Sequence, residues 1–209
     1  GLLDLLVQSH PNAKITVVCG PAAAGLFEAA PNIERLIVMD KMVFSLHWLR
    51  MWGLTVGKFW NLVIDLRNAP LSYIVPSLRQ RHLGKVKNTE HRVIGISRVL
   101  GLENNPPAPK LFCSDADQLQ ARTLIPDGAP VLAIGPTANW ASKTWRVDYF
   151  AELTQRFSQP GGLMPDCRIA LFGRDDERPD AIRLIEAIPW ERRIDLIGRL
   201  SLAEVYACL

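Results

Sequence analysis

The sequence predicts an α/β protein built on parallel sheets. Short apolar runs recur along the 209 residues and are bounded by turn residues. Most of these runs are apolar at nearly every position, which is typical of parallel strands covered by helices on both faces. Amphipathic stretches lie between the runs, and 15 prolines with 14 glycines suit the many short connections of such a fold. This alternation favours a doubly wound sheet.

Six apolar runs are predicted as strands: residues 14–19, 35–39, 62–66, 131–135, 168–172 and 194–197. Helices are expected between them over residues 22–30, 44–57, 90–100, 148–157 and 181–188. Gly101 stands where the C-terminus of the third helix favours glycine. The first residues of the chain also have a helical pattern. Ser201 and Glu204 form a capping box, so a further helix should begin at Ser201.

A proline-rich segment interrupts the alternation of strands and helices. Residues 103–110 hold three prolines within four positions, which is typical of a semi-rigid spacer and incompatible with a continuing helix. Three predicted strands precede this segment and three follow it. We therefore expect a first domain over residues 1–104, a linker and crossover over 105–127, and a second domain over 128–209. The alternative is a long surface loop within one sheet.

Composition argues against several classes of protein. Lys and Arg number 24 against 21 Asp and Glu, and the net charge of +3 is too small to indicate nucleic-acid binding. The apolar stretch 42–66 contains His47, Arg50, Lys58 and Asp65, so we do not expect it to span a membrane. The four cysteines lie far apart without a C-x-x-C pair, which indicates free thiols in a reducing cytosol and neither metal nor redox chemistry.

The most informative polar segment is the loop Gly135–Arg146, which follows a predicted strand and precedes a predicted helix. It carries Thr137, Asn139, Ser142 and Lys143. Ligands bind at the carboxyl ends of strands in open α/β sheets, and hydroxyls, an ammonium and free backbone N–H groups suit a diphosphate. The loop has neither a P-loop nor a G-x-G-x-x-G pattern. The alternative is a solvated loop in which Lys143 caps local carbonyls.

A second polar loop, Phe172–Pro179, follows the next predicted strand. Its carboxylates, with Glu177 and Asp176 as the candidates, are placed to accept hydrogen bonds from ribose hydroxyls. The alternative is that these acids only favour the N-terminus of the following helix through its dipole.

A basic cluster lies in the first half of the chain, over Leu78–Lys87 with His91 and Arg92. It suits an anionic acceptor, a phosphate or an acidic membrane surface, and equally a solvated basic face. Several aromatic residues precede it and indicate either a membrane- or acceptor-facing surface or ordinary core packing: Trp48, Trp52, Phe59 and Trp60.

Several of these segments carry a resemblance to a known family. Residues 10–15 read HPNAKI, residues 60–67 read WNLVIDLR and residues 135–145 read GPTANWASKTW. Together with residues 32–41, 173–178 and 196–204 they resemble, in order and spacing, the motifs of glycosyltransferase family 9, the bacterial ADP-heptose:lipopolysaccharide heptosyltransferases. The match with the nucleotide loop G-x-x-W-x-x-K-x-W is the most specific. The resemblance runs almost from end to end of the chain.

The resemblance implies a GT-B fold of two Rossmann-like domains with parallel sheets, both incomplete in this chain. It places the ADP-sugar donor on the C-terminal half. By this resemblance Thr137, Ser142 and Lys143 would hold the diphosphate. Glu177 would hold the ribose hydroxyls, and the backbone near Leu200 the adenine.

The resemblance also implies an acceptor and a mechanism. The N-terminal half would face a phosphorylated or Kdo-containing lipid-linked glycan at the inner membrane surface, with Arg79, Arg81 and Lys85 as acceptor-binding residues. Similar enzymes invert the anomeric carbon without a bound metal, as a carboxylate activates the acceptor hydroxyl. No covalently bound cofactor and no nucleic-acid partner are expected. The implied location is cytoplasmic, with peripheral attachment to the inner membrane left open.

Two departures from the family pattern matter. The G-D-x-L-x-x-T-P loop with the expected catalytic Asp would lie before residue 1, and that role is not transferred to Asp4. The D-S/T-G-x-x-H segment would lie after the last residue. We therefore expect an internal fragment that is not a competent enzyme alone. The alternatives are another GT-B nucleotide-sugar enzyme, with a different donor or epimerase chemistry, and a non-catalytic nucleotide-sugar-binding module.

Overall fold

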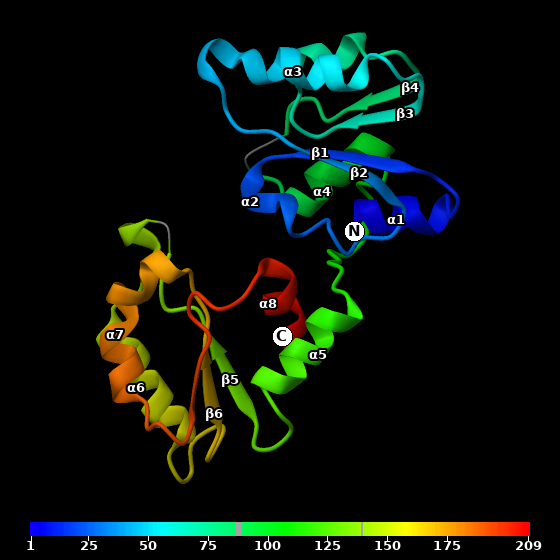
Figure 1. Cartoon of the computed structure of the whole chain (residues 1–209). Helices are drawn as coiled ribbons and strands as arrows, with labels where there is room; N and C mark the ends of the chain where they lie inside the picture. Colours follow the sequence, from blue (N-terminus) through cyan, green and yellow to red (C-terminus); the bar gives the residue numbers. More distant parts are fainter. Residues whose placement is uncertain (87–88, 139) are drawn as a thin grey trace. The chain divides into compact units, whose positions relative to one another are not determined.

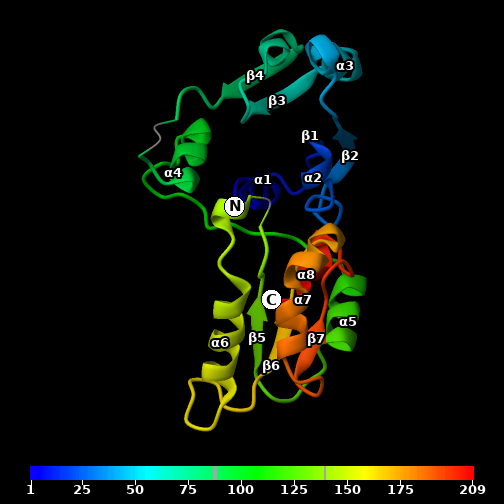
Figure 2. The ribbon, with the colours of Figure 1, turned by 90° about the vertical axis from the view of Figure 1, so that its left-hand side faces the viewer.

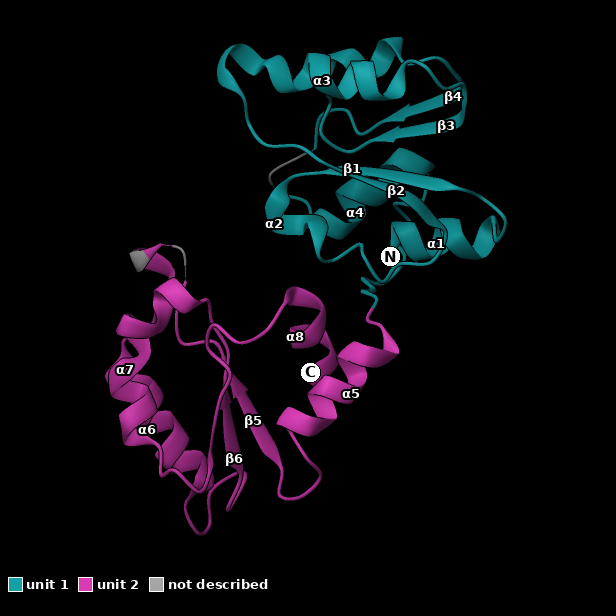
Figure 3. Ribbon diagram, viewed as in Figure 1, with its two compact units in different colours: residues 1–112 teal, residues 113–209 magenta. Residues whose placement is uncertain are grey.

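The chain divides into two compact units, Gly1–Phe112 and Cys113–Leu209 (Figure 3). The computed structural model describes residues 1–86, 89–138 and 140–209. The division falls inside the 105–127 segment expected to link two domains, and residues 102–114 contain neither helix nor strand. The predicted α/β class with parallel sheets is confirmed, because every strand pair in the described residues is parallel.

The first unit contains two separate two-stranded parallel sheets, β1–β2 and β3–β4. Its elements, labelled in Figure 1, are α1 (Leu2–Ser9), β1 (Ile15–Cys19), α2 (Pro21–Ala24), β2 (Ile33–Val38), η1 (Val43–Ser45), α3 (Leu46–Thr55), β3 (Trp60–Asp65), η2 (Pro70–Ile74), β4 (Ser77–His82), α4 (Arg92–Ser97) and η3 (Arg98–Leu100).

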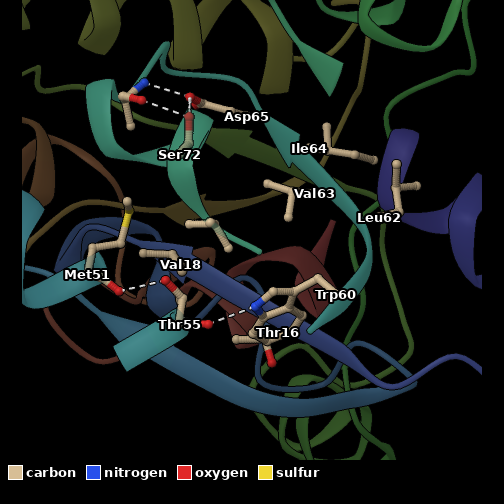
Figure 4. A pocket seen from close by; sticks show the side chains of 12 residues that line it. Thr16, Val18, Met51, Thr55, Trp60, Leu62, Val63, Ile64, Asp65 and Ser72 are labelled. Carbon is tan, nitrogen blue, oxygen red and sulfur yellow. Dashed lines mark hydrogen bonds between the residues drawn. The ribbon is translucent and has the colours of Figure 1, made fainter. Parts of the chain in front are cut away.

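Strands β1 and β3 each pair with a single neighbour among the described residues. Their side chains, including Thr16 and Val18 of β1 and Leu62 of β3, line one cavity of about 170 Å³ together with Met51 and Thr55 of α3 (Figure 4). Both strands therefore have an edge without a strand partner beside this cavity. Val18 stays 39% exposed and Leu62 36% exposed, although the sequence predicted strands covered on both faces.

Two elements of the first unit differ from the prediction. Residues 77–82, which the sequence presents only as part of a basic cluster, form β4 in register with β3. Four strands rather than three therefore precede the proline-rich segment. The apolar-run criterion misses β4 because it is an edge strand with polar, solvent-exposed side chains. The helix expected over 22–30 ends at Ala24, and the chain continues in turns from Gly25, because glycine weakens a helix interior.

The second unit is built around one three-stranded parallel sheet in the order β5–β6–β7. Figures 1 and 2 show α5 and α6 on opposite faces of this sheet, while α7 packs beside α6 and α8 packs beside α5. Its elements are α5 (Asp115–Leu124), β5 (Val131–Ile134), η4 (Ala141–Lys143), α6 (Val147–Ser158), β6 (Arg168–Leu171), η5 (Asp175–Glu177), α7 (Arg178–Ala187), β7 (Arg193–Asp195) and α8 (Leu202–Cys208).

The core of the second unit is closed to solvent. Leu171 of β6 and Leu184 of α7 are both 0% exposed, and α6 adds Phe150 to the same cluster. Cys167 is also fully buried, and burial raises the pKa of its thiol, in keeping with the unreactive free cysteine that the sequence predicts.

Two predicted helix termini are confirmed, one in each unit. Gly101 adopts the left-handed conformation (φ 71°) after η3, and Ser201 with Glu204 forms a complete capping box at the start of α8. Helix α5 was not predicted. It begins at its own capping box, Ser114 with Asp117, but its polar first turn hides the helical pattern. In the part of the chain that the structure describes, no helix is both long and apolar enough to cross a membrane.

Candidate functional site

The candidate donor site lies at one edge of the sheet in the second unit. In the strand register Ile134 is opposite Leu171, and Leu171 is opposite Asp195, so β5, β6 and β7 end side by side. The loops that follow these three strands therefore start at the same carboxyl edge. This is the place where open parallel sheets bind their ligands.

The structure brings together two predicted site residues that are 40 positions apart. The hydroxyl of Thr137 donates to Glu177 Oε2 at 2.8 Å, and the same oxygen accepts from the backbone N–H of Arg174 at 3.0 Å. Gly173 lies against this pair, because a Cβ there would be 3.3 Å from Thr137 Oγ1 and 3.5 Å from Glu177 Oε2. A carboxylate fixed in this way keeps its other oxygen for a ligand hydroxyl.

The second carboxylate candidate is engaged elsewhere. Asp176 forms an ion pair with the guanidinium of Arg174 at the exposed surface. Both acids also belong to the short helix η5 that precedes α7. Their negative charges therefore also stabilise the N-terminus of α7 by interacting with the helix dipole. Of the two, Glu177 is the one that contacts Thr137.

Lys143 and Ser142 lie in η4, on the loop after β5. The Lys143 ammonium is 5.1 Å from the centre of the Trp140 ring, and the Lys143 backbone N–H donates to the Trp140 carbonyl at 2.9 Å. Within the described residues the ammonium forms no ion pair, so the cation–π contact leaves its charge available to an anion. Asn139, the other polar residue predicted in this loop, lies outside the described residues.

The third strand ends in a charge pair that fixes the loop toward α8. Arg178 donates to Asp195 from both terminal guanidinium nitrogens, Nη1 and Nη2. Asp195 also accepts a hydrogen bond from the backbone N–H of Ile197 at 3.2 Å. Burial acts to raise the pKa of Asp195, but the bonds from Arg178 and Ile197 outweigh it and hold that pKa below its ordinary value. The same bond raises the pKa of Arg178. Leu200, the predicted adenine neighbour, follows this loop and is half-buried directly before the cap of α8.

The predicted acceptor residues lie in the first unit. Arg79 and Arg81 are exposed on β4, two positions apart and therefore on the same face of the strand. Lys85 is exposed just beyond the strand. Lys87, which ends the continuous stretch of the predicted basic cluster, lies outside the described residues.

The aromatic residues near the basic cluster have mixed environments. The indole N–H of Trp52 donates to the Ile74 carbonyl at 3.4 Å, and that of Trp60 donates to the Thr55 carbonyl at 2.9 Å. These two side chains and Trp48 are half-buried, whereas the side chain of Phe59 is exposed. The tryptophans thus serve local packing, as one of the two sequence-based interpretations expected.

A buried polar cluster at the carboxyl edge of β3–β4 was not predicted. Asp65 accepts hydrogen bonds from the backbone of Arg67 and Ala69 and from the Ser72 hydroxyl, at 2.7, 2.6 and 2.6 Å. Figure 4 shows the bond between Asp65 and Ser72. His82, the register partner of Asp65, has its Nδ1 atom 3.4 Å from the Ser72 hydroxyl. An Asp that ends an apolar run was the available sequence signal.

No group of three or more His, Cys, Asp or Glu side chains within the described ranges is arranged to hold a metal ion. Comparison with known proteins gives one family match: the model described as glycosyltransferase family 9 (heptosyltransferase) matches residues 81–209, which is more than half of the chain. No curated protein matches the sequence.

Several solved structures are similar in fold, including the following three. A glycosyl transferase family 9 protein from Veillonella parvula is 17% identical, with a TM-score of 0.77, over 99% of this chain and 67% of that one. The E. coli ADP-heptose LPS heptosyltransferase II is 17% identical (TM-score 0.63; 99% and 70% covered). The E. coli heptosyltransferase WaaC with ADP is 18% identical (TM-score 0.61; 97% and 71%). These likenesses confirm the predicted GT-B-type α/β fold.

Proposed function

Since the chain belongs to glycosyltransferase family 9, we propose that it serves the transfer of a heptose, or a related sugar, from an ADP-sugar to the core glycan of a lipopolysaccharide or a similar acceptor. The observation that supports this proposal is the hydrogen bond between Thr137 and Glu177 at the carboxyl edge of one parallel sheet, with Lys143 on the loop that follows β5. We assign to this edge a fixed carboxylate and a cation for one ligand. A sugar nucleotide needs both kinds of group.

Each donor residue has a role that follows from its contacts. Glu177 accepts from Thr137 and from the backbone of Arg174, and we assign its remaining oxygen to the ribose hydroxyls. The Thr137 hydroxyl donates its hydrogen bond to Glu177. We therefore assign Thr137 to positioning that carboxylate beside the diphosphate, and not to donating a hydrogen bond to a phosphate. Ser142 and Lys143 would bind the diphosphate, and the backbone near Leu200 the adenine.

The chemical step that we propose inverts the anomeric carbon. The acceptor oxygen attacks that carbon as a carboxylate removes the hydroxyl proton, and the bond to the departing diphosphate breaks. Lys143 would stabilise the charge that develops on the diphosphate, a role assigned here to a protein cation rather than a metal ion. The carboxylate base stays unassigned among the residues of this chain.

The acceptor would be anionic and held by the first unit. Arg79 and Arg81 present two cations on one face of β4, with Lys85 beyond its end. Arginine binds phosphate and carboxylate groups through paired N–H donors, so this face suits a phosphorylated or carboxylated sugar.

We also propose that the first unit works against a membrane surface. Val43 and Phe44 of η1 are 77% and 94% exposed, and Leu46 and Leu49 of α3 are exposed as well. Residues 41–64 contain three cations and no acidic residue. Asp40 precedes this segment, and Lys58 pairs with Glu34. This leaves Lys41 and Arg50 as the cations beside the exposed apolar side chains. An exposed apolar segment with such cations favours an anionic lipid surface, where apolar side chains insert and cations meet the headgroups.

The donor assignment is tested by titrating the protein with ADP and ADP-heptose in a calorimeter and by comparing ADP, UDP and GDP in a thermal-shift assay. We expect ADP to raise the melting temperature most, because a ligand that binds the folded state stabilises it. A larger shift with UDP or GDP would indicate another donor. No binding at millimolar ADP would overturn the proposal, whereas transfer to an anionic glycan would exclude a non-catalytic module.

The membrane assignment is tested by sedimentation with vesicles of phosphatidylglycerol and phosphatidylethanolamine. We expect the double variant V43S/F44S to lose most of the binding. Leu119→Ser, which removes another exposed apolar side chain (68% exposed) in the second unit, serves as the control and should bind as the original protein does. Equal binding by both variants would place the membrane contact elsewhere.

A further inference from the structure

A polar pocket lies at the carboxyl edge of β3 and β4, next to Lys85 but lined by residues that have no role in the proposed function. These strands end as register partners at Asp65 and His82, so the loops that follow them start side by side. Together with the start of α4 they enclose a surface pocket of about 270 Å³, lined by residues 66–68, Leu83, Gly84, Val86 and Arg92.

The two loops are fixed to each other by short polar contacts. The side chain of Asn68 donates to the Gly84 carbonyl at 2.9 Å and accepts from the Gly84 N–H at 3.0 Å. Asn68 itself adopts the left-handed conformation (φ 52°), which asparagine tolerates better than most residues. The buried carboxylate of Asp65 holds the backbone N–H of Arg67 at 2.7 Å. The backbone that carries Arg67 is therefore anchored on both sides.

The pocket is positively charged and lacks a counter-charge among the described residues that line it. Arg67 and Arg92 both line it, and within the described chain neither forms an ion pair. Their guanidinium groups are thus not engaged in the way of Arg98, Arg178 and Arg192, which each bind a carboxylate. Two guanidinium groups at one polar pocket match an oxyanion, which each can bind through paired N–H donors.

We propose that the Arg67–Arg92 pocket binds a phosphate group carried by a sugar. The charge selects the phosphate, and the volume of about 270 Å³ leaves room for part of the sugar ring as well. If the proposed transferase function holds, this sugar phosphate belongs to the acceptor, and the pocket adds a binding site beyond β4. The assignment of the pocket to a phosphate stands on the geometry of the first unit alone.

The proposal is tested by calorimetric titration of the whole chain with inorganic phosphate, with glucose 6-phosphate and with phosphatidic-acid vesicles. We expect glucose 6-phosphate to bind more tightly than inorganic phosphate. Arg67→Gln and Arg92→Gln should each weaken its binding by at least about tenfold, the scale of a lost charge-assisted hydrogen bond. Arg122→Gln, an exposed arginine of the second unit, is the matched control and should leave the affinity unchanged.

Three outcomes would overturn the proposal: affinity unchanged in both arginine variants, equal affinity for the sugar phosphate and free phosphate, or loss only of vesicle binding in Arg67→Gln. Circular dichroism of each variant separates loss of binding from loss of folding. ADP titrated in parallel keeps the two proposals apart. Failure of ADP to bind counts against the donor site, whereas failure of glucose 6-phosphate counts against this pocket.

Discussion

The two units share one sequence pattern and bury it differently. In the second unit three strands form one sheet, and Leu171 and Leu184 are completely enclosed. In the first unit four strands form two separate pairs, and apolar strand residues such as Val18 and Leu62 stay partly exposed. The apolar runs are of similar character in both units. Strand pairing, rather than the hydrophobicity of the strands, therefore sets how deeply each run is buried.

The polar edges of the two units differ in the same way. In the second unit the site carboxylate Glu177 already has two internal donors, Thr137 and the Arg174 N–H. In the first unit the loops are fixed by internal bonds, but the charged groups Arg67 and Arg92 have no partner among the described residues. The carboxylate at one edge is held by internal hydrogen bonds, whereas the two arginines at the other form no ion pair within the described residues.

The largest expected effect tests the difference in burial. Leu184→Ala should lower the free energy of unfolding by about 2–5 kcal/mol, because it leaves a cavity in a closed core. Leu62→Ala should cost less than about 1.5 kcal/mol, because that side chain is partly hydrated already. Urea unfolding followed by circular dichroism measures both. Similar losses in the two variants would contradict the contrast between the units.

Two glycines with the same backbone conformation sharpen this contrast. Gly198 (φ 74°) and Gly101 (φ 71°) are both left-handed, but a Cβ at Gly198 would lie 2.8 Å from the Cα of Asp175, whereas nothing lies within 4 Å of one at Gly101. We expect Gly101→Ala to cost about 1 kcal/mol for the conformation alone. Gly198→Ala should cost about 2–4 kcal/mol because steric strain adds to it. If both variants shift the urea midpoint equally, the backbone around Gly198 accommodates a Cβ as readily as that around Gly101, and the contrast fails.

The charge available at the donor edge is tested by Lys143→Ala. This variant should weaken ADP binding by about 1.5–3 kcal/mol, the scale of a charge-assisted hydrogen bond. Arg156→Ala is the control, because it removes an exposed cation of α6 that pairs with Glu152. Isothermal titration decides between them: an unchanged affinity in Lys143→Ala, or an equal loss in the control, would remove Lys143 from the site.

The smallest expected effect concerns acid stability. The pKa of Asp195 lies below its ordinary value of 3.8, so its charged form contributes stability above that value and loses it as pH falls through the lower, folded-state pKa. Asp195→Asn should therefore cost about 1 kcal/mol above roughly pH 5 and progressively less as the pH falls below 3.8. Asp176→Asn, at a more exposed ion pair, should change little at any pH. Chemical denaturation at several pH values measures the difference.

Hydrophobic periodicity predicts much of this fold, and its failures have physical causes. The predicted strands 131–135 and 168–172 match β5 (Val131–Ile134) and β6 (Arg168–Leu171) to within one residue. Strand β4 was missed, because its stability comes from pairing with β3 rather than from apolar side chains. Helix α5 was missed for a different reason, because it follows a proline-rich stretch and starts with polar residues.

The site was predictable only in part. The segment after β5 could be recognised from its polar residues and its resemblance to glycosyltransferase family 9, and the family is confirmed. The contact between Thr137 and Glu177 depends on the register of β5 and β6, which no local pattern encodes. The Arg67–Arg92 pocket depends on two loops meeting beyond β3 and β4, and β4 itself was not predicted. The roles of the individual site residues stay predictions.

The open edges of β1 and β3 make protein concentration an experimental variable. Within the described ranges, each edge presents a row of backbone groups without a strand partner on one side, beside apolar side chains such as Val18 and Leu62. Such an edge is a template onto which a strand of another molecule can add. Light scattering should therefore rise with protein concentration. The rise should begin at a lower concentration during refolding than during storage of the folded protein. Dilution should favour recovery of unassociated protein. Unfolding curves are therefore best compared at one fixed, low protein concentration.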